Sequence, residues 1–367
     1  MDDVLHTDYL PGRTLISSGK EYLYFSGTSY LGMARNEELQ AYLQEGISRY
    51  GANYSSTRLS NVQLNVYAEA EKYLASLTGA EAALTISAGF LAGQLIIRTL
   101  EGTADFIYGP RTHPALWRQK TDSYTGSFEA WIDRLPELVE KSEQENIVIL
   151  CNSLDPLLAI KYNFDWLEDL PATKNITVII DDSHGFGVTG KEGAGIFSEI
   201  SAPAGVELIV VTSMGKALGI PAGLILGKEK TLASFRQSPF FGGGSPAIPA
   251  YLYAFLKATN IYPEARQKLL KTIRHFQSQL TDPALFHSIT NYPVFYTPHN
   301  HLCAFLYDKD MLISSFPYPT PQSPHVTRVI LNSLHTPDDI SKLAAAINEF
   351  AWNLGEKRNR SGLEPNK

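Results

Sequence analysis

The sequence predicts an α/β protein with a central, mostly parallel sheet. Between residues 82 and 227, short apolar runs alternate with segments whose apolar residues recur at helical spacing. The runs are continuous instead of alternating with polar residues, which is typical of parallel strands that helices cover on both faces. Strand and helix in regular alternation indicate one layered α/β domain, and 367 residues leave room for a second domain.

Two helices are expected first, at residues 37–51 and 66–79, because each has apolar residues at helical spacing and ends in glycine. The alternating part follows. Its expected strands are 82–87, 105–109, 146–153, 175–182, 207–213 and 223–227, and its expected helices are 89–102 and 113–120.

The character of the sequence changes after about residue 235. A long helical stretch is expected at 247–280, strands at 301–307 and 326–333, and a final helix at 336–354 that starts with Thr336 as N-cap and proline next. We therefore expect three parts. They are an N-terminal segment at 1–35 that packs with the smaller domain, a large α/β domain at 36–235, and an α+β domain at 236–367 with a polar tail from 355.

Composition excludes several classes of protein. The net charge of −7 is spread along the chain, which argues against nucleic acid or an anionic membrane as the main partner. The first residues lack the apolar core of a signal peptide, and no apolar run approaches the roughly 18 residues of a membrane span. Cys151 and Cys303 lie far apart in apolar segments, so reduced thiols and a cytoplasmic protein are expected, with a disulfide as the minor alternative.

Polar residues directly after the expected strands are the first candidates for a site, because ligands of open α/β sheets bind at the carboxyl ends of strands. Asp181 and Asp182 end one apolar run, Ser213 ends the next with Lys216 close behind, and the run at 82–87 breaks at Ala88 before a helix. Each has a plainer role available as well. Asp181 could simply cap a turn, and His184 could be a hydrogen-bonded structural histidine. Lys216 could be a surface cation, as most lysines are.

Two other kinds of site fit less well. Asp181, Asp182 and His184 offer metal ligands, but His113 and His335 lie outside any spaced ligand motif, so a metal site is disfavoured. Neither phosphate-binding glycine motif, G-x-x-x-x-G-K-[ST] or G-x-G-x-x-G, occurs at a strand-to-helix junction.

The remaining interpretation makes Lys216 the Schiff-base amine of pyridoxal phosphate. That cofactor needs a carboxylate at its pyridinium nitrogen, a helix N-terminus for its phosphate and a group over its ring. Asp181 can supply the carboxylate and His184 can reach the ring oxygen. Gly89 and Phe90 can offer backbone N–H groups with the Ser213 hydroxyl beside them, and His113 can stack on the ring. Because side chains alternate along a strand, only Asp181 should touch the cofactor, and Asp182 should face the other side.

With these residues assembled, the chain resembles the α-oxoamine synthases, a family of fold-type I pyridoxal-phosphate enzymes. "SYLGM" (29–33), "RYGANYSSTRLS" (49–60), "IDDSHGFGVTGKEGAG" (180–195), "TSMGKALG" (212–219) and "RVILNSLHT" (328–336) are similar to motifs of that family in the same order. The likeness runs from about residue 12 to 350. It implies a large mostly parallel-sheet domain, a smaller α+β domain and pyridoxal 5′-phosphate as cofactor.

The resemblance also implies an activity and a set of contacts. The reaction would be the decarboxylative condensation of an amino acid with an acyl-CoA, carried out by a homodimer. Lys216, His113 and Asp181 would be catalytic, and Arg328, Thr28 and Arg13 would contact substrate. The implied cofactor contacts are Ala88, Gly89, Phe90, His113, Ser153, Asp181, His184, Ser213 and Lys216.

Several positions depart from the family pattern, mostly on the substrate side. Thr28 replaces an asparagine, Tyr67 a histidine and Ala88 a serine, and the segment before Asp155 lacks its glutamate. Further departures are Asn53, Ser56 and Thr57 for small residues of the loop before Arg58, Gly93 for asparagine, and Gly242 and Gly243 for Ser-Thr. Another pyridoxal-phosphate reaction, such as that of an aminotransferase or lyase, and a non-catalytic homologue therefore stay open as alternatives.

Overall fold

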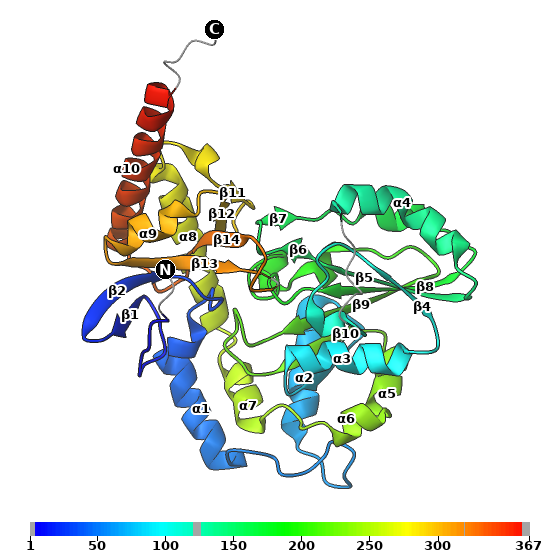
Figure 1. Cartoon of the computed structure of the whole chain (residues 1–367). Coiled ribbons are helices and arrows are strands. Elements are labelled where there is room, and N and C mark those ends of the chain that lie inside the picture. Colours follow the sequence, from blue (N-terminus) through cyan, green and yellow to red (C-terminus); the bar gives the residue numbers. More distant parts are fainter. Residues whose placement is uncertain (1–3, 120–125, 319, 362–367) are drawn as a thin grey trace. The chain divides into compact units, whose positions relative to one another are not determined.

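The structure is a computed structural model, and it describes residues 4–119, 126–318 and 320–361 (Figure 1). The chain divides into two compact units. The large unit comprises Asn36–Asp155 and Lys161–Pro263, and the small unit comprises Met1–Arg35, Pro156–Ile160 and Glu264–Lys367.

The expected boundary at 235/236 differs from the boundary in the structure, which lies after Pro263. The cause is helix α7 (Pro249–Lys257), which packs on helices α1 and α2 of the large unit. A Cβ on Gly46 of α1 would lie 2.6 Å from the carbonyl oxygen of Ala250, so the two helix backbones are in contact. Sequence composition does not reveal such a pairing between distant helices.

The large unit is built on a sheet with the strand order β3-β10-β9-β8-β5-β4. Strands β4, β5, β8 and β9 are parallel, and β10 is antiparallel to both β9 and β3, so every strand except β10 runs the same way. The strands are β3 (Ala82–Ile86), β4 (Asp105–Tyr108), β5 (Asn146–Asn152), β8 (Asn175–Asp181), β9 (Val206–Ser213) and β10 (Gly223–Gly227), with a separate pair β6 (Leu154–Asp155) and β7 (Ile160–Lys161). The expected mostly parallel sheet is confirmed.

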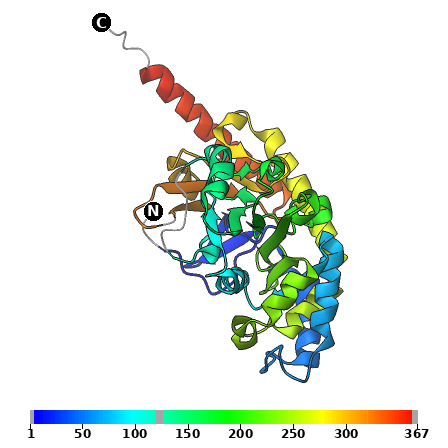
Figure 2. The same ribbon diagram turned by 90° about the vertical axis from the view of Figure 1, so that its right-hand side faces the viewer.

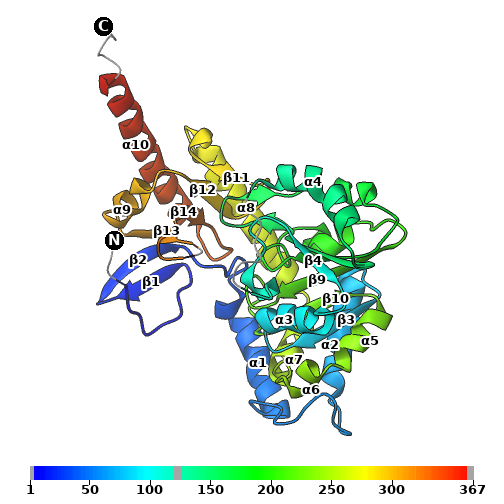
Figure 3. The same cartoon turned by 45° about the vertical axis from the view of Figure 1, so that its right-hand side comes forward.

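Helices cover both faces of this sheet (Figure 3). Leu150 of β5 and Ile179 of β8 belong to an apolar cluster with residues of α3 and α5, so these helices cover one face. Cys151 of β5 points to the other face, because side chains alternate along a strand. Trp131 of α4 lies close to Gly109, which is next to Cys151, so α4 covers this other face. The helices of this unit are α1 (Glu37–Tyr50), α2 (Asn65–Thr78), α3 (Gly89–Leu100), α4 (Phe128–Lys141), α5 (Glu229–Arg236), α6 (Pro239–Gly243) and α7.

The small unit holds a second sheet with the order β1-β2-β13-β14-β12-β11. Its strands are β1 (Thr14–Ser17), β2 (Lys20–Phe25), β11 (His287–Ser288), β12 (Val294–Thr297), β13 (Met311–Pro317) and β14 (His325–Ile330); its helices are α9 (His301–Tyr307) and α10 (Pro337–Ser361). Helix α8 (Ile261–Gln279) begins in the large unit and lies mainly in the small one. The start of α10 has the expected cap, because Asp339 N–H donates to Thr336 Oγ1 at 3.2 Å and Thr336 N–H donates back to Asp339 Oδ2 at 2.8 Å.

Four expected elements differ in the structure. The helical stretch expected at 247–280 forms two helices, α7 and α8, with a break between Lys257 and Ile261. Residues 301–307 form helix α9 instead of a strand, since Leu302 and Leu306 are both buried at a helical spacing of four. Helix α10 continues through Ser361, into the expected tail (Figure 2). The helix expected at 113–120 is one 3₁₀ turn, Pro114–Leu116, followed by extended Trp117, and Lys120 lies outside the described residues.

Both cysteines are free thiols, Cys151 buried and Cys303 half-buried. Among the described helices, none is both long and apolar enough to cross a membrane.

Candidate active site

The candidate site lies where β5, β8 and β9 end, at Asn152, Asp181 and Ser213; we call this the carboxyl edge. Asn152 is paired in register with Asp181, and Asp181 with Val211. Alternation along each strand puts these side chains on the same face as Leu150 and Ile179, which is the face covered by α3.

Asp181 and Asp182 point to opposite sides of the strand. Asp181 Oδ1 accepts a hydrogen bond from Ser183 N–H at 2.8 Å. Asp182 is 1% exposed, and its Oδ2 accepts from Ile196 N–H at 2.9 Å. Burial raises the pKa of Asp182 to about 7, although the Ser153 hydroxyl and the Ile196 N–H both favour the charged form.

The glycines after Asp182 make room for its carboxylate. A Cβ on Gly185 would lie 2.1 Å from Asp182 Oδ1, and a Cβ on Gly195 would lie 2.2 Å from Oδ2. Gly195 also has φ 74° and ψ −166°, a conformation that residues with a side chain rarely adopt. The loop from 183 to 196 thus encloses Asp182 and leaves Asp181 on the α3 face.

The His113 side chain lies beside Asp181, with 3.6 Å between His113 Nδ1 and Asp181 Oδ2. Nδ1 accepts a hydrogen bond from Ala115 N–H at 3.2 Å, so this nitrogen carries no proton and the contact with Asp181 is not an ion pair. Burial lowers the pKa of His113 and the charge of Lys216 lowers it further, against the opposing charge of Asp181. The ring is therefore neutral, with its proton on Nε2.

Lys216 follows the end of β9 in a turn and is half-buried. Burial lowers the pKa of Lys216 from its ordinary value of 10.5, and the charges of Asp181 and Asp182 partly oppose this shift. A lysine amine with a lowered pKa loses its proton more readily, so it can act as a nucleophile or move a proton.

The N-terminus of α3 meets the carboxyl edge at Ser213. Ala88 is the N-cap of this helix and makes no side-chain cap, so the first backbone N–H groups remain available to an anion. A Cβ on Gly89 would lie 2.6 Å from Ser213 Cβ, so only glycine allows the helix to approach this closely. The Ser213 hydroxyl accepts from Gly215 N–H at 3.2 Å, and the Phe90 side chain is 54% exposed.

Ser153 and His184 occupy less direct positions than expected. Ser153 N–H donates to the Asp181 carbonyl at 2.9 Å, but the Ser153 hydroxyl acts on Asp182, on the side away from α3. His184 is half-buried in the turn after Ser183. The residue before Ser153 is Asn152, and its side chain lies on the same face of the sheet as Asp181. The sequence interpretation missed it. Alternation along the strand was the signal that could have identified it.

Ser183 is a second residue that the interpretation missed. Its hydroxyl accepts from Ser213 N–H at 3.0 Å, and its own N–H donates to Asp181, so it ties the ends of β8 and β9 together.

The three expected substrate contacts, Arg328, Thr28 and Arg13, lie in the small unit. Arg328 is 5% exposed and donates to the Pro156 carbonyl at 2.9 Å. Arg13 donates to Asp339 Oδ1 at 2.7 Å, beside the start of α10, and its side chain is 41% exposed, so its contact with substrate stays a prediction. Thr28 is half-buried after β2.

Several departures from the family pattern coincide with close internal packing. Tyr67 is buried and donates to the Ala247 carbonyl at 2.9 Å. Thr57 Oγ1 donates to the Gly242 carbonyl at 2.7 Å. A Cβ on Gly93 would lie 2.6 Å from the Ala115 carbonyl oxygen, so the segment after His113 packs directly on α3.

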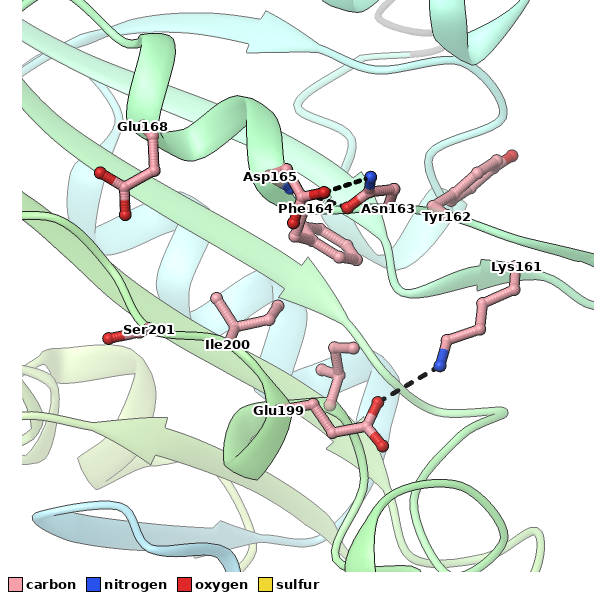
Figure 4. Close-up of a pocket in the computed structure, with 10 residues that line it drawn as sticks. Lys161, Tyr162, Asn163, Phe164, Asp165, Glu168, Glu199, Ile200 and Ser201 are labelled. Carbon is pink, nitrogen blue, oxygen red and sulfur yellow. Dashed lines mark hydrogen bonds and ion pairs between the residues drawn. The ribbon is translucent and has the colours of Figure 1, made fainter.

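A groove of about 580 Å³ lies elsewhere in the large unit, and Figure 4 shows its lining. Lys161 reaches toward Glu199 across it at 3.5 Å, and Ile196, whose N–H holds Asp182, lines it as well. It contains none of the residues that the sequence indicated for the site.

The residues at the carboxyl edge fit pyridoxal phosphate. They combine a lysine amine of lowered pKa, a carboxylate beside a neutral imidazole, and a helix N-terminus brought against a serine by a glycine that a Cβ could not replace. These are the three kinds of group that the cofactor needs.

Known proteins agree with this fit. The aminotransferase class I and II family matches residues 20–347. The 8-amino-7-oxononanoate synthase of Petrotoga mobilis is 26% identical over 360 residues, covering 92% of this chain and 90% of the relative. The same enzyme of Aromatoleum aromaticum is 29% identical over 362 residues, covering 90% of each. A solved structure of SPT with its PLP internal aldimine has a TM-score of 0.80 at 16% identity, covering 96% of this chain and 93% of that one.

The fold and the site define a fold-type I pyridoxal-phosphate enzyme, with pyridoxal 5′-phosphate as its cofactor. The chain belongs to the aminotransferase class I and II family. The relatives also confirm the resemblance that the motifs indicated, an enzyme of the α-oxoamine synthase kind.

Proposed function

We propose that this enzyme condenses an amino acid with an acyl-CoA and releases carbon dioxide, as an 8-amino-7-oxononanoate synthase does in biotin precursor synthesis. In this reaction the bond from the amino acid Cα to its carboxylate breaks, a bond from Cα to the acyl carbon forms, and CoA leaves as the thiol. The observation that carries the proposal is the grouping of Lys216, Asp181 and His113 at the carboxyl edge, in a chain whose relatives are named for that reaction.

The cofactor, when bound, supplies an electron sink for the charge that develops on Cα. We assign Lys216 to hold the cofactor carbonyl and to move the proton at Cα, since its lowered pKa favours the free amine. Asp181 would keep a proton on the ring nitrogen, and buried surroundings make a carboxylate effective there. The neutral His113 would cover the ring and exclude water.

The phosphate would take N–H groups at Gly89 and Phe90 with the Ser213 hydroxyl. Ala88 and His184 would complete this cofactor environment, and Ser153 would contribute through its backbone N–H, which donates to the Asp181 carbonyl. For Arg328 and Thr28 the family motif is the only support, and it assigns Arg328 to the substrate carboxylate. A guanidinium binds carboxylate in a two-pronged manner, so Arg328→Lys should raise the KM for the amino acid more than it lowers kcat.

A homodimer and a cytoplasmic location are part of the proposal. Leu59, Val62 and Phe240 are 54%, 62% and 54% exposed, and the loop that carries Leu59 is bound to α6 through Thr57. Apolar side chains exposed together are typical of an interface, and a second copy is the partner that the family resemblance implies. Two free thiols are in accord with a reducing compartment.

Cofactor binding is tested first. Purified protein with added pyridoxal phosphate should develop a visible absorption band that borohydride removes, and Lys216→Ala should lack the band. A matched control is Lys228→Ala, because Lys228 precedes α5 at the far end of β10 and is exposed. Wild-type protein without the band would refute the proposal.

The reaction is tested by CoA release. Alanine, glycine and serine are each combined with short, long and dicarboxylic acyl-CoAs, and one pair should release CoA and carbon dioxide together. If no pair does so while the visible band is present, an aminotransferase or lyase reaction is favoured and the acyltransfer proposal fails. If the band is absent as well, the chain is a non-catalytic homologue.

A further inference from the structure

The segment that carries His113 crosses the sheet. His113 follows β4, which is the edge strand, yet its ring lies beside Asp181 of β8. Strand β5 lies between β4 and β8, so residues 111–113 must pass over the end of β5. The last residue of β5 is Asn152.

The Asn152 amide binds this segment on both sides of Thr112. Asn152 Nδ2 donates to the Arg111 carbonyl at 2.7 Å, and His113 N–H donates to Asn152 Oδ1 at 3.1 Å. Asn152 is 8% exposed, so loss of either bond would leave a polar group without solvent to replace it. Only a side-chain amide can donate and accept in this way, and glutamine is one methylene longer.

The backbone of the crossing segment needs such support. Arg111 has φ 52°, a left-handed conformation that costs a residue with a side chain roughly 1–2 kcal/mol. Trp117 Nε1 donates to the Thr112 carbonyl at 2.7 Å, and Gln94 Nε2 donates to the Ala115 carbonyl at 2.9 Å. Gln94 holds the segment from α3. On the sheet side, Thr112 Oγ1 donates to the Leu150 carbonyl of β5 at 3.2 Å, and Asn152 is the side chain of β5 that bonds to both Arg111 and His113.

Resting on the proposed function, we propose that Asn152 is a positioning residue that holds His113 beside Asp181 in the cofactor site. We call the two hydrogen bonds of the Asn152 amide to this segment the clamp. Asn152 and Asp181 are paired in register on neighbouring strands, so the sheet itself fixes the distance from the clamp to the Asp181 carboxylate. His113 is then already ordered beside Asp181 before the cofactor binds, so binding does not have to order it. Without the clamp, part of the binding free energy is spent on ordering that segment.

The first experiment measures the Kd for pyridoxal phosphate by titration of the apoprotein. Asn152→Leu should weaken binding about tenfold, which corresponds to about 1.4 kcal/mol for the lost preorganisation. Asn152→Asp should weaken it as well, since its carboxylate would face the Arg111 carbonyl. The control is Asn146→Leu at the other end of β5, where Nδ2 donates to the Thr103 carbonyl at 3.1 Å, and its Kd should equal that of the wild type.

A double-mutant comparison shows whether Asn152 acts through His113. In a His113→Ala background, Asn152→Leu should change the Kd less than twofold. An equal tenfold loss in both backgrounds would show a general structural role and overturn the proposal. If Asn152→Leu fails to fold by near-UV circular dichroism, the isosteric Asn152→Asp replaces it in both comparisons.

A readout without cofactor separates this inference from the proposed function. Diethyl pyrocarbonate modification of His113 in the apoprotein, mapped by mass spectrometry, should be several-fold faster in Asn152→Leu than in the wild type or Asn146→Leu. Unchanged rates would refute the clamp. If wild-type protein takes up no pyridoxal phosphate, the proposed function fails, while the modification rates still decide whether Asn152 holds His113.

Discussion

Asp181 and Asp182 are consecutive residues at the end of β8, yet their carboxylates have different surroundings. Asp181 faces α3, where its Oδ2 lies 3.6 Å from His113 Nδ1, and the charge of Lys216 interacts with both carboxylates. Asp182 faces the opposite side, where Ile196 N–H and two glycines enclose it. The difference comes from alternation along the strand, and it separates a carboxylate that faces a site from one that holds a loop.

The contrast extends to what each carboxylate needs from its neighbours. Burial raises the pKa of Asp182 to about 7, so near neutral pH it is partly protonated and is held mainly by backbone. The side of Asp181 instead gathers titratable and anion-binding groups from several elements: Lys216 after β9, His113 after β4 and the N-terminus of α3. Such convergence of groups is typical of a catalytic site, whereas Asp182 resembles a buried structural acid.

The largest effect is expected for Asp181→Asn. A neutral amide would not stabilise a proton on the ring nitrogen of the cofactor. The rate of CoA release should therefore fall on the order of a thousandfold, with the thermal unfolding midpoint nearly unchanged. Asp182→Asn is the matched control. Its amide oxygen can still accept from Ile196 N–H, so activity should remain within severalfold of the wild type. Equal losses in the two variants would contradict the assignment of opposite faces.

A stability effect of intermediate size is expected for Gly195→Ala. Its Cβ would collide with Asp182 Oδ2 in a backbone conformation with φ 74°, so the free energy of unfolding should fall by about 2–4 kcal/mol in urea titrations. Gly51→Ala is the control, because Gly51 has φ 75° and ψ −179° with no atom within 4 Å of its Cβ position. If both variants lose the same amount, the Asp182 carboxylate does not depend on this glycine.

The remaining effect is a pH dependence of stability, which is small for each single pH unit although it extends over several. Asp182 has a pKa of about 7 in the folded protein and 3.8 as its ordinary value, so between these pH values the folded state binds more protons than the unfolded state. The contribution of Asp182 to stability is therefore complete below about pH 4 and is lost as the pH rises through 7. At the steepest point it changes by about 1.3 kcal/mol per pH unit.

The measurement compares urea titrations of the wild type and Asp182→Asn at pH 5, 6, 7 and 8. The advantage of the wild type should shrink from pH 5 to 7 and stay constant above. A difference that is constant over the whole range would show that Asp182 is ionised throughout.

The sequence alone predicted much of the large unit because its signals are local. Helices α1 and α2 end at Gly51 and Gly79 as expected, and the continuous apolar runs became strands of the sheet. The strand-end position of Asp181 and the polar residues after β9 also indicated the candidate site at the carboxyl edge, since that rule depends only on strand direction.

Other features depend on contacts between distant segments. The strand expected at 301–307 is helix α9, because burial of one face decides between two periods in a short apolar run. The boundary after Pro263 follows from α7 packing on α1 and α2. Arg13 pairs with Asp339, which is 326 residues away in the sequence, so no local pattern could indicate this ion pair.

By itself, the sequence determined the fold class, the cofactor and the order of the residues at the carboxyl edge, because periodicity, capping and motif spacing are written along the chain. Only the tertiary structure decided which side chains meet there. Register between β5 and β8 places Asn152 beside Asp181, whereas the Ser153 hydroxyl turns to Asp182. A shift of one residue along a strand reverses the face of every side chain, and that register is set by pairing in three dimensions.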